Sequence, residues 1–372
     1  MPTTETPRII VVTGATGNQG SGVVRALLAS EENWHIRALT RDVNSSWAKA
    51  LVDELPRDAE AGRLSLVQGH AYDPSSLRSA FARAHGVFAV TSEIYPGKVL
   101  VEEAEMAHEI EAGRNMVFAA KEAGVKHFVF SSLPDMDKTT RGQYPGIHHM
   151  NNKHAVEKIA NEHLSGVTCL IPVLALTEGF VFSLRRFLLY ESEMASLQPT
   201  PVKQVAQWTD PSYDMGSFAA SKSTTRTQLN TIMPLPFAHG FSVQSIVQGT
   251  DRGYAEIFDL GAEKTAGKTY LVMSPLITPK EMAETFTKVT GQPAVHDPIS
   301  PETFGEMTAP FVGPAFKLDA QKMMDWASVT PSDKVCFGAM DHEKMNDAFE
   351  ELGLQASTFE NWLRRSGWKG PE

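Results

Sequence analysis

The chain has 372 residues, of which 42% are hydrophobic and 21% charged, and its formal net charge at pH 7 is -10. This length suits one large α/β domain with an accessory lobe, or two domains, and the composition is ordinary for a soluble globular protein. The acidic balance argues against direct binding of nucleic acid or of an anionic membrane surface. The sequence shows no signal-like N-terminal segment and no apolar run of the ~20 residues that a membrane span needs, which predicts a cytoplasmic location, with the nucleus as the other option.

Short apolar runs alternate with segments of helical spacing through the first half of the chain. The expected strands are residues 8–13, 35–40, 64–68, 86–91, 125–131 and 168–176. The expected helices between them are residues 19–30, a helix beginning at Asp73 and Pro74, and residues 99–123 and 153–164. Alternation of this kind is typical of a parallel sheet covered by helices on both faces.

After about residue 180 the alternation stops. The segment 185–240 is rich in Pro, Ser, Thr and Gln and predicts long loops with short elements. Regular patterns return as a strand at 268–273 and as helices at 278–290, 317–327, 342–353 and 359–365. The sequence therefore predicts a Rossmann-type doubly wound parallel sheet over 1–180, completed by parts of 241–275. A smaller α/β C-terminal lobe is expected over 181–372, with a long irregular segment at about 185–240.

A glycine-rich loop directly follows the first expected strand and opens the first helix. Glycines suit a sharp turn in which the backbone must approach a pyrophosphate, and the helix N-terminus presents free N–H groups to the phosphates. The residues expected to hold a dinucleotide here are Gly14, Thr16, Gly17, Asn18, Gln19 and Gly20. In this structural context the motif is a strong indication of NAD(P) binding.

The end of the second strand indicates which dinucleotide is bound. Arg41 follows this strand, and a guanidinium pairs well with the 2′-phosphate of NADP, whereas an acidic residue would favour the ribose 2′-OH of NAD. Asp42 comes next and offers that second option. We therefore expect NADP(H) as the cofactor, with NAD(H) as the less favoured alternative.

Five segments share the pattern of one known family. They are Val11–Gly20, Ile36–Arg41, Ala123–Ser132, Asn152–Glu157 and Thr358–Leu363. Through these segments the chain resembles the NmrA-like proteins, a divergent branch of the short-chain dehydrogenase/reductase superfamily. The resemblance covers most of the chain and is weakest over about 185–240. It implies that Asn152–Glu157 lies on the family's lysine-bearing helix.

The resemblance implies two kinds of role. Some members bind NAD(P) without evident turnover and act as redox-sensing regulators of a protein partner, such as a GATA-type transcription factor in fungal nitrogen metabolite repression. Others reduce quinones, imines, dyes or phenolic substrates with NADPH. In the superfamily the long helix expected here at 101–123 often packs in dimers, so a homodimer is also implied.

We favour an NADPH-dependent oxidoreductase that reduces a small hydrophobic carbonyl, quinone or imine. The apolar stretch at 172–180 and the segment 185–240 suit a pocket peculiar to this chain. The alternative is a non-catalytic NADP(H)-sensing regulator that binds a protein partner such as a transcription factor. Family membership by itself does not choose between the two.

The expected catalytic residues lie around Lys153. Ordinary short-chain dehydrogenases use a Tyr-x-x-x-Lys pattern, in which the tyrosine donates a proton and the lysine lowers its pKa. Here His149 occupies the tyrosine position, four residues before Lys153 and on the same helix face. Three interpretations stay open: Lys153 only anchors the nicotinamide ribose, His149 or Tyr144 donates the proton, or Lys153 is itself the acid.

Further site residues are expected where strands end, because ligands of open α/β sheets gather at the carboxyl ends. Those expected to touch the cofactor or substrate are His70, Thr91, Ser131, Ser132 and Pro172. The two serines equally suit caps of a turn or helix. The only cysteines, Cys169 and Cys336, and the scattered histidines form no metal-binding pattern, so no metal site is predicted.

Overall fold

The computed structural model describes most of the chain outside the long segment that follows Pro172. The described residues are 7–172, 231–234, 248–272, 275, 277–297, 299–330, 334–341, 344–355 and 357–369. Apart from the strand β7 (Thr231–Pro234), the segment expected to be irregular at about 185–240 lies outside these residues.

A seven-stranded parallel sheet forms the centre of the molecule, in the order β3-β2-β1-β4-β5-β6-β8. Its strands are β1 (Arg8–Val12), β2 (Trp34–Thr40), β3 (Leu64–Gln68), β4 (Gly86–Ala89), β5 (His127–Ser131), β6 (Val167–Pro172) and β8 (Thr269–Val272). The strand order reverses at β1, so the carboxyl ends of β1 and β4 flank the crevice where such sheets bind ligands. The predicted fold class, a doubly wound α/β sheet, is confirmed.

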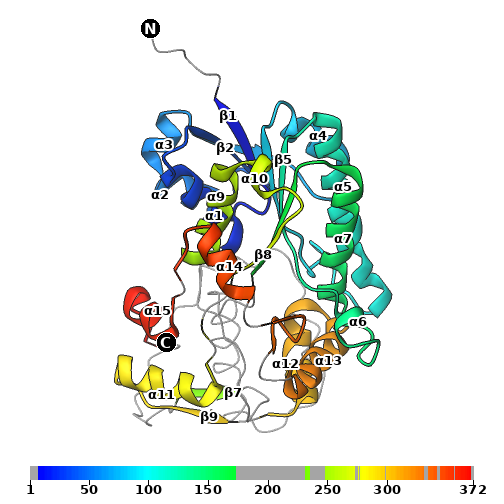
Figure 1. Ribbon diagram of the computed structural model, residues 1–372, viewed down its shortest axis with the longest axis vertical. Helices are drawn as coiled ribbons and strands as arrows, with labels where there is room; N and C mark the ends of the chain where they lie inside the picture. Colours follow the sequence, from blue (N-terminus) through cyan, green and yellow to red (C-terminus); the bar gives the residue numbers. More distant parts are fainter. Residues whose placement is uncertain are drawn as a thin grey trace.

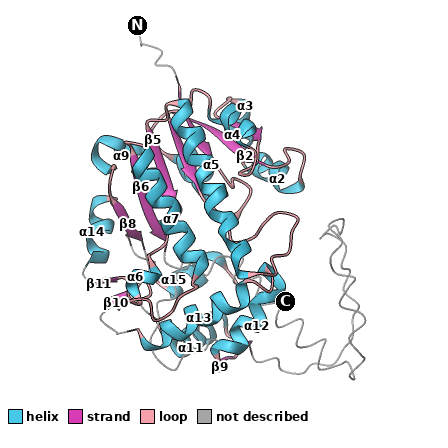
Figure 2. Cartoon of the chain, turned by 90° about the vertical axis from the view of Figure 1, so that its right-hand side faces the viewer, coloured by secondary structure: helices cyan, strands magenta, loops and turns pink. Residues whose placement is uncertain are grey.

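Helices cover both faces of this sheet (Figure 1). One face packs α1 (Asn18–Ala29) and α9 (Gln248–Leu260) against the strands, and the other packs α4 (Pro74–Phe81), α5 (His108–Ala123) and α7 (His148–His163). Figure 2 shows α5 and α7 side by side along their length. The remaining helices on the sheet side are short: α2 (Ser46–Glu54), α3 (Pro56–Glu60), α6 (Met136–Thr139) and α10 (Ala262–Thr265).

The helix expected over 99–123 begins later than its sequence pattern suggested. A 3₁₀ turn, η1 (Glu103–Ala107), precedes α5, and residues 99–101 are not helical. The carboxylate of Glu105 accepts hydrogen bonds from the backbone N–H groups of Val101 and Glu102. Because a side chain satisfies these amides, the helix has no upstream turn to continue into.

The described part of the C-terminal lobe packs below the carboxyl ends of the strands (Figure 1). Its elements are α11 (Pro279–Thr290), β9 (Ala294–Asp297), α12 (Pro301–Val312), α13 (Phe316–Val329), β10 (Lys334–Val335), β11 (Met340–Asp341), α14 (Lys344–Glu351) and α15 (Phe359–Ser366). Helices α12 and α13 form one apolar cluster with Met136, Ile147 and Met150 from α6 and the start of α7. This cluster presses α13 against the first turn of α7.

A buried histidine lies at the opposite, amino end of the sheet. His127 is 1% exposed, and its Nε2 lies 2.9 Å from Thr168 Oγ1 and 3.2 Å from Thr265 Oγ1. Burial lowers the pKa of His127 to about 4. The folded protein therefore holds this imidazole in its neutral form.

We predict that His127 makes the fold sensitive to acid. Its folded pKa of about 4 lies below the unfolded value of 6.5, so its contribution is complete above pH 6.5 and is lost as the pH falls towards 4. The lost free energy of unfolding approaches about 3 kcal/mol. Urea unfolding of His127→Gln at pH 7, 6 and 5 should show a flatter pH dependence than the wild type. The control, His35→Gln, should keep the wild-type slope; equal slopes in all three proteins would contradict this account.

Candidate functional site

The glycine loop after β1 places backbone N–H groups at the carboxyl edge of the sheet. Gly17 is the N-cap residue of α1 and provides no side-chain cap to the first amides of the helix. A Cβ atom on Gly20 would lie 2.2 Å from the carbonyl oxygen of Gly14, so only glycine allows this close turn. The loop is therefore a cradle without side chains at a helix N-terminus, which fits the phosphates of a dinucleotide.

The other residues expected at the cofactor surround this loop in different ways. Thr16 is half-buried and Asn18 is exposed, whereas the Gln19 amide donates to the hydroxyl of Tyr254 on α9 at 3.0 Å. Arg41 is exposed immediately after β2. His70 follows β3, and its Nδ1 accepts from the backbone N–H of Tyr72. These contacts leave the Arg41 side chain open to an anionic ligand.

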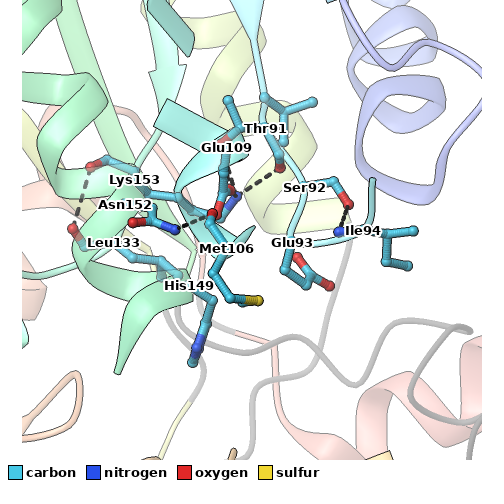
Figure 3. Close-up of polar contacts among 12 residues, drawn as sticks. Thr91, Ser92, Glu93, Ile94, Met106, Glu109, Leu133, His149, Asn152 and Lys153 are labelled. Atoms are coloured by element: carbon cyan, nitrogen blue, oxygen red, sulfur yellow. Dashed lines mark hydrogen bonds and ion pairs between the residues drawn. The ribbon is translucent and has the colours of Figure 1, made fainter. Parts of the chain in front are cut away.

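Lys153 lies in a closed polar network on the second turn of α7 (Figure 3). Its ammonium donates to the Thr91 carbonyl oxygen at 2.7 Å, to Thr91 Oγ1 at 3.1 Å and to Glu109 Oε1 at 2.5 Å. Thr91 Oγ1 also donates to Glu109 Oε1, at 2.6 Å. The three donors of the lysine thus all have acceptors within the protein.

Glu109 comes from the first turn of α5 and is fully buried. Its Oε2 atom has no hydrogen-bond partner among the described residues. A Cβ on Gly113, one turn further along α5, would lie 2.2 Å from Val156 on α7. The glycine therefore lets the two helices approach closely enough for Glu109 to reach Lys153.

His149 makes a separate charge pair on the first turn of α7. Its backbone N–H donates to Asp319 Oδ2 at 2.8 Å, and its Nδ1 lies 2.5 Å from Asp319 Oδ1. Asp319 is fully buried on α13. The His149 side chain is 12% exposed, its Nε2 makes no hydrogen bond with the described residues, and Figure 3 shows the ring pointing away from Lys153.

Several carboxylates set the charge of His149. Burial alone would lower its pKa, but the neighbouring carboxylate of Asp319 outweighs this effect, and Glu93 and Glu109 act in the same direction. The pKa of His149 is therefore raised, which favours the imidazolium near neutral pH. A carboxylate at Nδ1 also leaves Nε2 as the atom that can exchange a proton with a ligand.

The remaining expected residues lie apart from this pair. Tyr144 packs against Trp326 of α13, with ring centroids 5.4 Å apart. The Ser132 hydroxyl is buried and donates to Glu157 on α7. Ser131 is buried at the end of β5, and Pro172 ends β6. Catalytic roles for Tyr144 and Ser132 stay predictions, and these contacts give neither side chain a path to Lys153 or His149.

The sequence reasoning did not find Glu109 or Asp319. The run of glutamates before and within α5 suggested a solvated face, yet Glu109 shares its buried stripe with Ala112, Gly113 and Met116. Asp319 likewise shares a buried stripe of α13 with Ala320 and Met323. An acidic residue within an apolar helical stripe is the signal that would have marked both.

Breaking the Lys153–Glu109 pair should destabilise the fold. Glu109→Gln keeps the side-chain shape but leaves a buried ammonium without a counter-charge, and we predict a loss of about 3 kcal/mol in the free energy of unfolding. Urea titration measures it. Glu111→Gln, on the exposed face of α5, is the matched control and should change stability by at most about 0.5 kcal/mol. Adding Lys153→Met to Glu109→Gln should recover part of the loss; no recovery would argue against a coupled pair.

Together the fold and the site define a class of protein. A doubly wound parallel sheet, with a glycine loop after β1 and a lysine-bearing helix between β5 and β6, is a Rossmann-type architecture. The model of the NmrA-like family matches residues 6–328. The chain belongs to the NmrA-like family.

The individual relatives are more distant. The chain is 38% identical over 142 residues to the NmrA-like family domain-containing oxidoreductase malD of Malbranchea aurantiaca, a match that covers 37% of this chain and 38% of the relative. A second relative, the NmrA-like family domain-containing oxidoreductase ptmS of Penicillium ochrochloron, is 28% identical over 50% of this chain and 52% of its own length. The chain thus spans only about half or less of the length of these curated relatives.

Solved structures resemble the whole described architecture. NmrA, a negative transcriptional regulator solved in complex with NAD, matches with a TM-score of 0.64 at 15% identity, covering 96% of this chain and 94% of the other. The triphenylmethane reductase of Citrobacter sp., complexed with NADP(H), gives a TM-score of 0.59 at 19% identity, covering 95% and 98%. At such identities the likeness shows the fold alone.

Two searches of the described residues found nothing. None of their helices is long and apolar enough to cross a membrane. No group of three or more His, Cys, Asp or Glu side chains among them is placed to hold a metal ion.

Proposed function

We propose that the protein is an NADPH-dependent oxidoreductase that reduces a hydrophobic carbonyl, quinone or imine. The observation that carries the proposal is His149: a buried carboxylate orients its ring, and its Nε2 has no partner among the described residues. An imidazole held in this way is an arrangement suited to proton transfer. It lies one helical turn from Lys153, where short-chain dehydrogenases carry their proton-donating tyrosine.

The chain's own residues fit the cofactor. The glycine loop and the uncapped first turn of α1 suit the pyrophosphate, and the exposed guanidinium of Arg41 suits a 2′-phosphate. When bound, the reduced nicotinamide supplies a hydride. The neutralised Lys153–Glu109 pair holds α7 and the end of β4 in register, and His149 donates the proton at Nε2.

One observation favours a second function. Because Lys153 spends its three donors on Thr91 and Glu109, it has none left for a ribose in this arrangement. A lysine used only for structure suits a regulator that binds NADP(H) without turnover. The regulator NmrA, solved with NAD, shares the fold. In this alternative a protein partner such as a transcription factor reads the bound state.

Cofactor preference tests the role of Arg41. We predict that Arg41→Ala weakens NADPH binding roughly tenfold or more, because a charge-assisted pair with the 2′-phosphate is lost. NADH binding should change little. Calorimetric titration with both dinucleotides measures the two effects. Arg57→Ala, an exposed arginine on the nearby α3, should leave both affinities unchanged; equal weakening of NADPH and NADH would remove Arg41 from the phosphate site.

Turnover tests the function itself. We predict that the purified chain consumes NADPH at 340 nm with at least one member of a panel of quinones, imines and aromatic carbonyls. His149→Gln should lower kcat/KM on carbonyls and quinones about 100-fold, the usual loss when a general acid is removed. His154→Gln, further along α7, is the control and should retain activity. Tight NADPH binding without turnover of any panel member would favour the regulator instead.

A further inference from the structure

Asp319 is devoted to His149. Both of its carboxylate oxygens bond that one residue, Oδ2 with the backbone N–H and Oδ1 with Nδ1, at 2.8 and 2.5 Å. No water reaches Asp319, which is fully buried. Phe316 on the same helix packs edge-on against the imidazole at 5.4 Å. The ring is therefore fixed in both position and tautomer, with Nδ1–H facing the carboxylate.

The charges around His149 favour its protonated form. Asp319 on α13, Glu93 in the loop after β4 and Glu109 on α5 are the carboxylates that act on it. Lys153, the nearby cation on α7, is bonded to Glu109 and so is largely neutralised. Nothing in this arrangement pushes the proton off the imidazole. His149 is thus supplied as an acid rather than as a base.

Resting on the proposed function, we infer that Asp319 and His149 form a proton-donating pair that selects neutral acceptors, ketones or quinones, over iminium cations. The acceptor carbon of a ketone takes a hydride, with its electron pair, from the dihydronicotinamide. The C=O π pair then moves to oxygen, which takes the Nε2 proton of His149. The acceptor leaves as an alcohol, the dinucleotide is oxidised, and solvent returns a proton to the imidazole. Asp319 touches neither partner, so it is a positioning residue.

An iminium cation would leave this pair without a task. Hydride addition to its carbon moves the C=N π pair to a nitrogen that already carries a positive charge, so the product is a neutral amine and no proton is consumed. The imidazolium would also repel a second cation placed beside it. Only an acceptor that becomes an anion on hydride transfer needs the acid that Asp319 maintains.

Matched probes test this selection. The probes are 1-tetralone and 1,4-naphthoquinone as neutral acceptors and N-methyl-3,4-dihydroisoquinolinium as the cation, each with NADPH. Wild-type protein should reduce a neutral probe with a kcat/KM at least about tenfold above that for the cation. Asp319→Asn should lower the neutral-probe kcat/KM about 100-fold and leave any iminium reduction within about twofold. Asp325→Asn on the same helix is the control and should behave as wild type.

A second readout does not depend on turnover. The NMR titration of the His149 ring should move to lower pH in Asp319→Asn, because the neighbouring negative charge is lost, and should not move in Asp325→Asn. Should Asp319→Asn fail to fold, His149→Gln carries the kinetic test with the same expected loss. Preferential reduction of the iminium, unaffected by either variant, overturns the inference and leaves the reductase standing. Turnover of none of the probes or of the wider panel, despite NADPH binding, overturns the proposed function and this inference with it.

Discussion

The buried pair between Lys153 and Glu109 constrains the carboxyl edge of the sheet more than any other contact. It joins α7, α5 and the chain that leaves β4 through Thr91, and it brings two unit charges into a region that is at most 9% exposed. Such a pair adds little net stability over apolar packing, but it tolerates no loss of one partner. Its value lies in geometry: the crevice wall beside β4 is held at one spacing from the helix that carries His149.

That anchoring gives the second pair its meaning. With α7 held to the sheet by Lys153, the first turn of the helix is free to face the C-terminal lobe, where Asp319 receives it. The apolar cluster of Met136, Ile147 and Met150 with α12 and α13 presses the lobe against this turn. The site is therefore assembled from both parts of the chain, and His149 acquires its partner only when α13 is docked.

The sheet was predictable from sequence because each strand carries its own local signal. Val11–Gly20 announces a strand, a glycine turn and a helix within ten residues, and the later strands repeat the pattern. The site was predictable only in part. Lys153 and His149 follow from helical spacing, but the His149–Asp319 contact spans 170 residues, and no local rule fixes which distant helix fills that space. Glu109 was misjudged because its neighbours Glu105 and Glu111 are partly or fully exposed.

The exchange of tyrosine for histidine accounts for both pairs. A phenol with a pKa near 10 must be made more acidic to donate a proton at neutral pH, so a tyrosine needs the nearby cation of the lysine. A buried histidine has the opposite problem, because burial removes its proton, and a cation beside it would make this worse. The substitution thus reverses the sign of the partner required: Asp319 supplies a negative charge at His149. Lys153, no longer needed as an activating cation, has its charge cancelled by Glu109. In the proposed reductase the two carboxylates are therefore consequences of one substitution on α7.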